Sequence, residues 1–289
     1  MFVRTDLHGH TFFSDGRATP EAFVSFRRGL GMQVVAISDH DLMAGVRRGA
    51  VVAHAHGMVL LPAQETTAVI HFGTPEAEQV HVLAYFPPSV LSGDRLERTA
   101  LYARGLKVQA AWREFVCAWL SGLPEDDRHA LDPTGELPRT EAGRFPALQS
   151  WLDRLSAHRP DRLTDFRLHH VRFWTEDREL FGWRPEEMMD AIRADGAVDV
   201  VAHAVRVRDK ARMDEVLAYA SGVEVYTSRH NASVAAGFRD YAERHGKLWT
   251  ASSDDHQNAA YMQPPCGTPV ATMERLLNGP VPAGWLSAA

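Results

Sequence analysis

The segment Phe2-Val3-Arg4-Thr5-Asp6-Leu7-His8-Gly9-His10 sets the pattern for the whole chain. Its first six residues predict a β-strand, and two histidines follow directly. Val34-Val35-Ala36-Ile37-Ser38 predicts a second, buried strand, which Asp39-His40-Asp41 follows in the same way. Between them, Thr19 and Pro20 predict the N-cap and first residue of a helix. Strand, helix and strand with short connections indicate a parallel sheet or barrel.

This alternation continues to about residue 90 and returns after residue 184. We expect further strands at 59–63, 80–86, 198–202, 222–226 and 248–252, with helices near 44–56, 185–194, 209–220 and 233–245. Between the two halves, apolar residues at helical spacing predict a long helix over 96–121, and a second helix lies near 146–157. We therefore divide the chain into a barrel domain (1–94 and 183–289) and a mainly helical insertion or lid (95–182).

The composition is that of a globular protein. A length of 289 residues with 45% hydrophobic and 24% charged residues fits one large domain carrying an insertion. The net charge of −6 argues against a protein that coats duplex nucleic acid. Two cysteines, Cys117 and Cys266, exclude a disulfide scaffold and suit a reducing compartment. With neither a membrane-length apolar run nor a signal peptide, we expect a cytoplasmic protein.

The chain contains 15 histidines, and their positions carry the functional prediction. On a strand, residues two apart face the same side, so His8 and His10 converge beyond the carboxyl end of the first strand. Asp254 and His256 repeat this spacing after the last strand. This edge is where α/β barrels place their chemistry. The candidate metal ligands at or near strand ends are His8, His10, Asp15, His40, Glu65, His81, His203, Asp254 and His256.

These ligand types predict a catalytic metal cluster. Imidazole and carboxylate ligands suit Mn, Fe or Zn, and the absence of cysteine nearby argues against a structural zinc site. Nine ligands are too many for one ion, so we expect two or three divalent ions that share a bridging carboxylate. Their excess positive charge would attract a phosphate dianion and lower the pKa of a bridging water.

The other histidines differ in whether we expect them at the metal site. His54 and His56 lie two apart on a predicted helix, where such side chains diverge, so we expect a surface pair. The pair His169-His170 in the insertion stays open. His230 follows the strand at 222–226 and could reach the barrel edge as a phosphate ligand or general acid.

Together, these residues resemble the polymerase and histidinol phosphatase (PHP) family of metal-dependent phosphoesterases. The matching stretches are Asp6–Thr11, Ser14–Gly16, Ala36–Asp41, Glu65, His81–Phe86, Val200–His203, Gly222–Tyr226 and Ser252–His256. They cover roughly residues 1–90 and 184–260. The resemblance implies a distorted (β/α)7 barrel that holds a metal cluster.

The resemblance also implies how the ligands are grouped. His8, His10, Glu65 and Asp254 would hold the first ion; a bridging Glu65 would hold the second with His81 and His203; Asp15, His40 and His256 would hold the third. Aspartate at position 15 and the 222–230 stretch resemble the branch that hydrolyses 3′,5′-bisphosphates, nucleoside monophosphates and short RNA 5′ ends. They look less like the histidinol-phosphate branch.

The sequence departs from that branch in places. Ala204 replaces the proline usual after the third-motif histidine, and Gln64 precedes Glu65 where an aliphatic residue is common. The insertion lacks the histidine of the branch's Arg-Ala-His-like helix start, which leaves Arg139 and Arg144 as candidate phosphate ligands. Acidic and basic residues are balanced over 95–182, which disfavours long nucleic-acid substrates.

We therefore expect a phosphoesterase that hydrolyses phosphate monoesters of a small nucleotide-like substrate, a nucleoside monophosphate or 3′,5′-bisphosphate, through a metal-activated hydroxide. Asp254 and His230 are the expected catalytic residues, and His230, Arg139 and Arg144 the expected substrate ligands. We expect no membrane partner, and the oligomeric state stays open.

Three alternatives remain. One is a histidinol-phosphate or other metabolite phosphatase. A second is an amidohydrolase, although none of Lys107, Lys210 and Lys247 occupies the middle-strand position of that class's carboxylated lysine. The third is a non-catalytic metal-binding module, which the complete set of nine ligands disfavours.

Overall fold

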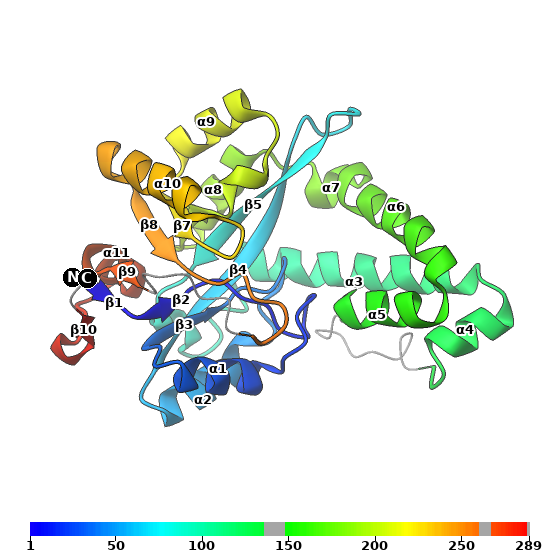
Figure 1. The fold of residues 1–289 in the computed structure, drawn as a ribbon, viewed down its shortest axis with the longest axis horizontal. Coiled ribbons are helices and arrows are strands. Elements are labelled where there is room, and N and C mark those ends of the chain that lie inside the picture. Colours follow the sequence, from blue (N-terminus) through cyan, green and yellow to red (C-terminus); the bar gives the residue numbers. More distant parts are fainter. Residues whose placement is uncertain (136–147, 260–266, 288–289) are drawn as a thin grey trace.

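Seven strands form one sheet that closes into a barrel (Figure 1). The computed structural model describes residues 1–135, 148–259 and 267–287. In sheet order the strands are β2 (Thr5–Asp6), β3 (Val34–Ile37), β4 (Val59–Ile70), β5 (Glu78–Tyr85), β6 (Val198–Val201), β7 (Gly222–Tyr226) and β8 (Leu248–Ala251). Backbone hydrogen bonds from Leu7 N to Ala251 O (3.4 Å) and from His10 N to Asp255 O (3.0 Å) join the last strand to the first. The predicted distorted (β/α)7 barrel is confirmed.

The distortion comes from β5, which runs antiparallel to both its neighbours, β4 and β6. Only residues 71–77 separate β4 from β5, too few for the crossover that a parallel connection needs. The parallel order expected from the first strands therefore stops here. The two strands form a long arm that extends beyond the rest of the barrel (Figure 1).

The predicted strand over residues 2–7 is divided at Arg4. Its first half, β1 (Phe2–Val3), pairs antiparallel with β9 (Thr268–Pro269) and β10 (Leu286–Ser287) in a separate small sheet. The helix α11 (Val270–Leu277) follows β9, and its Met273 and Leu276 pack with Val3 and Leu7 in the core inside the barrel. This sheet and α11 close the end of the barrel away from the metal-ligand candidates, and both termini lie there (Figure 1).

Helices cover the outside of the barrel. They are α1 (Pro20–Gly29), α2 (Val46–Ala55), α8 (Pro185–Ala194), α9 (Lys210–Tyr219) and α10 (Ala232–Arg244). Thr19 caps α1 as predicted: its side chain accepts a hydrogen bond from Ala22 N at 3.1 Å. Outward-facing strand residues such as Val35 and Val82 pack against apolar helix residues such as Phe23 and Met188.

The insertion stands to one side of the barrel as a helical lobe (Figure 1). It contains α3 (Ala100–Ser121), α4 (Glu125–Leu131), α5 (Leu148–His158), α6 (Pro160–Glu176) and α7 (Arg178–Phe181). The long helix and the helix near 146–157 are confirmed as α3 and α5, whereas α6 was not predicted. Trp112 of α3 and Phe166 of α6 are buried together in the core of the lobe. Within the described ranges, no helix is long and apolar enough to cross a bilayer.

Candidate metal centre

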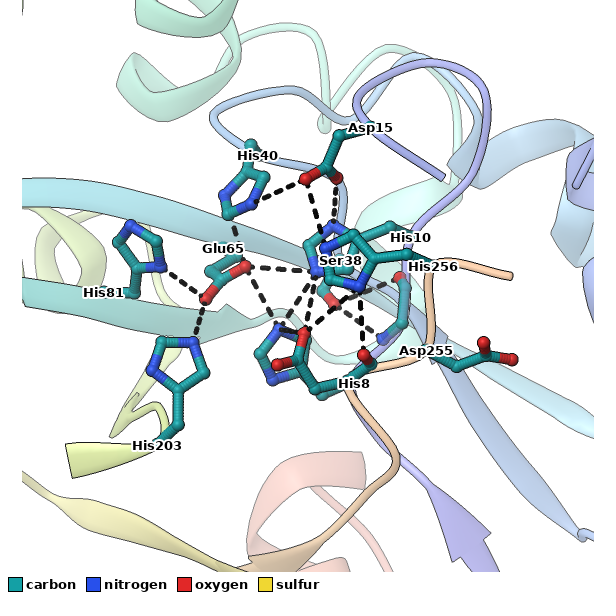
Figure 2. Close-up of polar contacts among 12 residues, drawn as sticks. His8, His10, Asp15, Ser38, His40, Glu65, His81, His203, Asp255 and His256 are labelled. Carbon is teal, nitrogen blue, oxygen red and sulfur yellow. Dashed lines mark hydrogen bonds and ion pairs between the residues drawn. The ribbon is translucent and has the colours of Figure 1, made fainter. Parts of the chain in front are cut away.

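The structure brings all nine predicted ligands together at one end of the barrel, as Figure 2 shows for eight of them. Seven follow the carboxyl ends of parallel strands or lie in the loops behind them, and Glu65 lies within β4. His81 lies in the first half of β5. Because β5 runs antiparallel, its first half lies beside the carboxyl ends of its neighbours. This reversal places His81 in the cluster.

One group surrounds Glu65 Oε2. His8 Nε2 lies 3.1 Å from this oxygen and His10 Nε2 lies 3.2 Å from it. Asp254 Oδ1 is 3.4 Å from His10 Nε2 and 3.7 Å from His8 Nε2. All four side chains are buried. Although imidazole nitrogens lie close to it, Glu65 Oε2 accepts no hydrogen bond from the described residues. Imidazole and carboxylate atoms converging on one buried point fit a divalent metal ion.

The other oxygen of Glu65 serves a second group. His81 Nδ1 lies 2.8 Å and His203 Nε2 lies 2.9 Å from Glu65 Oε1 (Figure 2). His40 Nδ1 is 3.2 Å from Oε2, so His40 lies between the groups. One carboxylate with histidines on both oxygens has the arrangement expected of a bridging ligand.

A third group centres on Asp15. Asp15 Oδ2 lies 3.1 Å from His256 Nε2 and 3.6 Å from His40 Nε2, and Asp15 Oδ1 lies 3.4 Å from His10 Nδ1. His10 therefore faces two groups, one with each ring nitrogen, and its ring stacks on His256 with centroids 4.2 Å apart. Seven of the nine side chains thus fall in three groups able to hold a metal ion, and His203 and Asp254 contact members of these groups, so that the nine form one continuous cluster.

The electrostatics of the cluster favour added positive charge. Burial would raise the pKa of Glu65 and Asp15, but the surrounding histidines outweigh it and hold both pKa values well below the usual range. Burial would lower the pKa of His10 and His40, but the neighbouring carboxylates raise each to about 9. The carboxylates are therefore ionised, and protons or metal ions compete for the histidines that surround them.

Glu224 supports the cluster from behind and was not among the predicted site residues. It is fully buried; its Oε1 lies 2.9 Å from His8 Nδ1, and its Oε2 accepts from His203 N at 2.8 Å. Such carboxylate–histidine contacts fix the orientation of a metal-binding imidazole. The signal was present in the sequence: Glu224 stands between Val223 and Val225 in a buried strand, where a charge needs a partner.

Strained backbone also marks the site. Asp41, His203 and Asp254 have φ values of +50°, +27° and +53°, which non-glycine residues rarely adopt. Arg104 of α3 forms a close, buried ion pair with Asp41, which also accepts from Thr67 N at 2.9 Å. The insertion is therefore fastened to the residue that follows His40.

A cavity of about 630 Å³ opens over the cluster. It is lined by Asp15, His40, Glu65, Gln79, His81, His203, Arg206, Ser228, Arg229, Asp254, His256 and Gln257. Arg229 Nε lies 2.6 Å from Asp254 Oδ2, yet the Arg229 side chain remains 42% exposed. Neither Arg206 nor Arg229 was predicted, because position in a loop does not reveal which way an arginine points.

His230 lies behind the residues that line the cavity. Its buried ring donates from Nδ1 to Val225 O (2.9 Å) and stacks on Phe238, and it does not line the cavity. Burial lowers its pKa, and Nε2 has no hydrogen-bond partner within the described residues. Its expected role remains a prediction.

The remaining candidates fall in three places. Arg139 and Arg144 lie outside the described residues. His54 and His56 lie at the end of α2, away from the cluster, as expected for a surface pair. His170, left open above, packs in the insertion, where its Nε2 accepts from Trp174 Nε1 at 2.7 Å.

Comparison with known proteins gives three likenesses. No protein-family profile matches the chain. A 3′,5′-nucleoside bisphosphate phosphatase of Chromobacterium violaceum is 24% identical over 266 residues, 87% of this chain and 86% of that protein. A structure from Bifidobacterium adolescentis, provisionally described as a metal-dependent phosphoesterase, matches with a TM-score of 0.65 and 24% identity over 96% of this chain and 97% of its own.

The third likeness is to a Chromobacterium violaceum structure called an amidohydrolase, with bound sulfate and no metal. The TM-score is 0.65, with 20% identity over 94% of this chain and 95% of that one. At these identities the two structures establish a shared fold. With the phosphatase relative, they confirm the predicted resemblance to the PHP phosphoesterases.

Proposed function

We propose that this chain, which resembles the PHP phosphoesterases and brings the nine predicted ligands together, is a metal-dependent phosphomonoesterase for small nucleotide-like substrates. The observation that carries the proposal is Glu65, whose two oxygens face different sets of histidines. The phosphatase relative supports the nucleotide class, since its substrates are nucleoside bisphosphates.

The ligands divide among two or three ions of Mn, Fe or Zn. Divalent cations held here would supply positive charge for phosphate oxygens and lower the pKa of a water molecule. The buried carboxylates and Glu224 hold His8, His10 and His203 in fixed positions. This rigidity matters because catalysis depends on groups that are already oriented before substrate arrives.

Arg229 is suited to hold the phosphate under attack. Its Nε donates to Asp254, and its guanidinium has no other hydrogen bond within the described residues, while the side chain is partly exposed and lines the cavity. A guanidinium presents these donors in a planar fork that matches phosphate oxygens. Arg229 thereby joins the phosphate site to a predicted metal ligand.

Other assignments extend the proposal. Asp254 would act as both ligand and catalytic residue, and the insertion over 95–182, with Arg139 and Arg144, would act as a lid over the substrate. His230 stays a candidate phosphate ligand or general acid; donation from Nε2, which has no hydrogen-bond partner among the described residues, would require a second proton on the ring beside the one that Nδ1 gives to Val225 O. A cytoplasmic location agrees with Cys117, a free thiol.

Three alternative functions make different demands on the residues of this site. A metabolite phosphatase such as a histidinol-phosphate phosphatase would use an identical metal centre. The amidohydrolase alternative lacks its lysine: Lys210 and Lys247 donate to backbone carbonyls outside the cluster, and Lys107 is exposed on α3. A non-catalytic module would bind metal without turnover.

The test is phosphate release from a panel of phosphomonoesters and diesters, with Mn, Fe or Zn added separately. We expect preferential release from nucleotides, lost in His8→Ala/His10→Ala. The matched control is His54→Ala/His56→Ala. It removes a second pair of histidines with the same spacing, at the end of α2, and should keep full activity. Full activity of the His8/His10 variant in metal-stripped buffer, or no release from any ester by the metal-loaded protein, would contradict the proposal.

A further inference from the structure

The hydrophobic core of the insertion includes residues from two barrel loops that carry predicted ligands. Phe13 lies two residues before Asp15, and Leu42 lies two residues after His40. Both apolar side chains are buried in the same cluster as Trp112 of α3. Because protein interiors are close-packed, a shift of either loop would disturb the packing of the insertion.

Polar contacts join the insertion to the same two loops. Arg104 of α3 forms the buried ion pair with Asp41, and the α3 backbone also lies against this residue: a Cβ added at Gly105 would be 2.3 Å from Asp41 O. On the other loop, Arg17 Nη1 lies 2.6 Å from Asp153 Oδ2 of α5. The exposed pair contributes little by itself, whereas loss of the buried one would leave a carboxylate without its cation.

The third group of ligands consists of Asp15, His40 and His256, and its last member is attached to the same assembly. Arg17 N donates to His256 O at 2.9 Å, so the segment that pairs with α5 also holds the loop of this histidine. His170 of α6 lies within electrostatic reach of the group: burial lowers its pKa to about 4, and the charges of Asp15 and His40 act on it. All three ligands (Figure 2) thus stand on segments attached to the insertion.

The other two groups are held from within the barrel. Glu224 of β7 accepts from His203 N and contacts His8 Nδ1, and His81 lies on β5. These supports come from strands of the sheet. The three groups therefore differ in what holds their ligands in place.

Resting on the proposed function and its division of the ligands among ions, we infer that the third group and the insertion form one coupled unit. Asp15, His40 and His256, when bound to one divalent cation, hold their loops at a fixed separation. The same loops carry Phe13 and Leu42, so the filled group orders the core of the insertion. Coupling between two sites is reciprocal, so the ordered insertion raises the affinity of the group for its cation by the same factor.

Hydrogen–deuterium exchange of the full-length, Mn-loaded protein tests the coupling. Asp15→Asn removes the carboxylate of the third group, and His81→Asn, the matched control, removes one ligand of the second. We expect peptides of α5 and α6 to exchange about 5- to 150-fold faster in Asp15→Asn than in wild type, and at wild-type rates in His81→Asn. Unchanged exchange in Asp15→Asn, or equal acceleration in both variants, would overturn the inference.

Elemental analysis of the same samples separates this inference from the proposals on which it rests. If Asp15→Asn keeps as many ions as wild type, the proposed division of the ligands fails, and the inference fails with it. If it loses one ion without faster exchange, the division stands and the inference alone fails. Absence of phosphate release from every ester would overturn the proposed function but not these results, since neither measurement depends on turnover.

The reverse direction is tested from the insertion. Gly105→Ala places a methyl group against Asp41 O, whereas Gly122→Ala, at the end of the same helix, meets nothing closer than 3.4 Å. In Mn titrations buffered by a chelator, we expect the ion that Asp15→Asn loses to bind at least about fivefold more weakly in Gly105→Ala and as in wild type in Gly122→Ala. Equal affinity in the two variants, or equal weakening of every ion in Gly105→Ala, would contradict the coupling.

Discussion

Arg27 Nη2 lies 2.6 Å from Asp255 Oδ2, and both side chains are buried. Arg27 Nε also bonds Asp6 Oδ2 at 3.0 Å, so one guanidinium from α1 joins the ends of the first and last strands of the barrel. These ends carry the two motifs with paired ligands, since His8 and His10 follow Asp6 and Asp254 precedes Asp255. The seam where the barrel closes is therefore also where the first metal group is assembled.

Arg27→Met should destabilise the protein by about 3–5 kcal/mol, because it leaves two buried carboxylates without their cation. Chemical denaturation of the metal-free protein measures the effect. Arg28→Met is the control: Arg28 is the exposed neighbour on α1 and should change the free energy of unfolding by less than about 0.5 kcal/mol. Equal midpoints for the two variants would show that the seam does not depend on Arg27.

Glu224→Gln should weaken metal binding about 10- to 100-fold, since the carboxylate that orients His8 loses its charge while its shape is kept. Competition against a chromophoric chelator gives the affinity. Glu215→Gln, an exposed change on α9, provides the comparison and should bind metal as wild type does. Wild-type affinity in Glu224→Gln would mean that His8 needs no support from behind.

Arg104→Met tests whether the insertion influences the cluster. The substitution removes the buried partner of Asp41, next to His40, and we expect metal affinity to fall about tenfold or more. Lys107→Met, one turn along on the exposed side of α3, is the control. Elemental analysis after dialysis measures the metal that each variant retains. If Arg104→Met retained as much metal as Lys107→Met, Arg104 would contribute to packing but not to metal binding.

Metal binding should depend on pH through His10 and His40, whose pKa values of about 9 lie above the ordinary value of 6.5. In chelator-treated protein these protonated histidines stabilise the fold below pH 6.5, and that stabilisation is lost as pH rises towards 9. Metal competes with the same protons, so affinity should increase over this range. We expect the Tm of metal-free protein to fall between pH 6.5 and 9 and the apparent metal affinity to rise. A flat affinity over this range would contradict the assignment.

The ligands could be predicted because they interrupt apolar segments. A histidine or carboxylate at the end of a run such as Val34–Ile37 has no role in the core, and the carboxyl ends of barrel strands meet at one place. His81 was listed as a candidate because it lies in a predicted strand, but its place beside Glu65 depends on the reversal of β5. The local pattern of β5 does not state its direction.

The arginines that support the cluster could not be predicted from the sequence, for a different reason. Arg27, Arg104 and Arg229 act through partners that lie 228, 63 and 25 residues away along the chain. Nothing in a local pattern separates them from the many arginines that form exposed pairs. The division of the first strand at Arg4 likewise depends on pairing with β9 and β10, near the other end of the sequence.

The insertion leaves the barrel after β5 and returns at α8, and none of the nine candidate ligands lies within it. Its Arg104 forms a buried ion pair with Asp41, and its apolar residues pack with Phe13 and Leu42 of the barrel. Under the proposed function, the hydrolytic centre and the insertion would therefore be separable along the chain. Exchange of the insertion, with Arg104 and these apolar contacts kept, would then be a route to new substrate preferences in which all nine candidate ligands are retained.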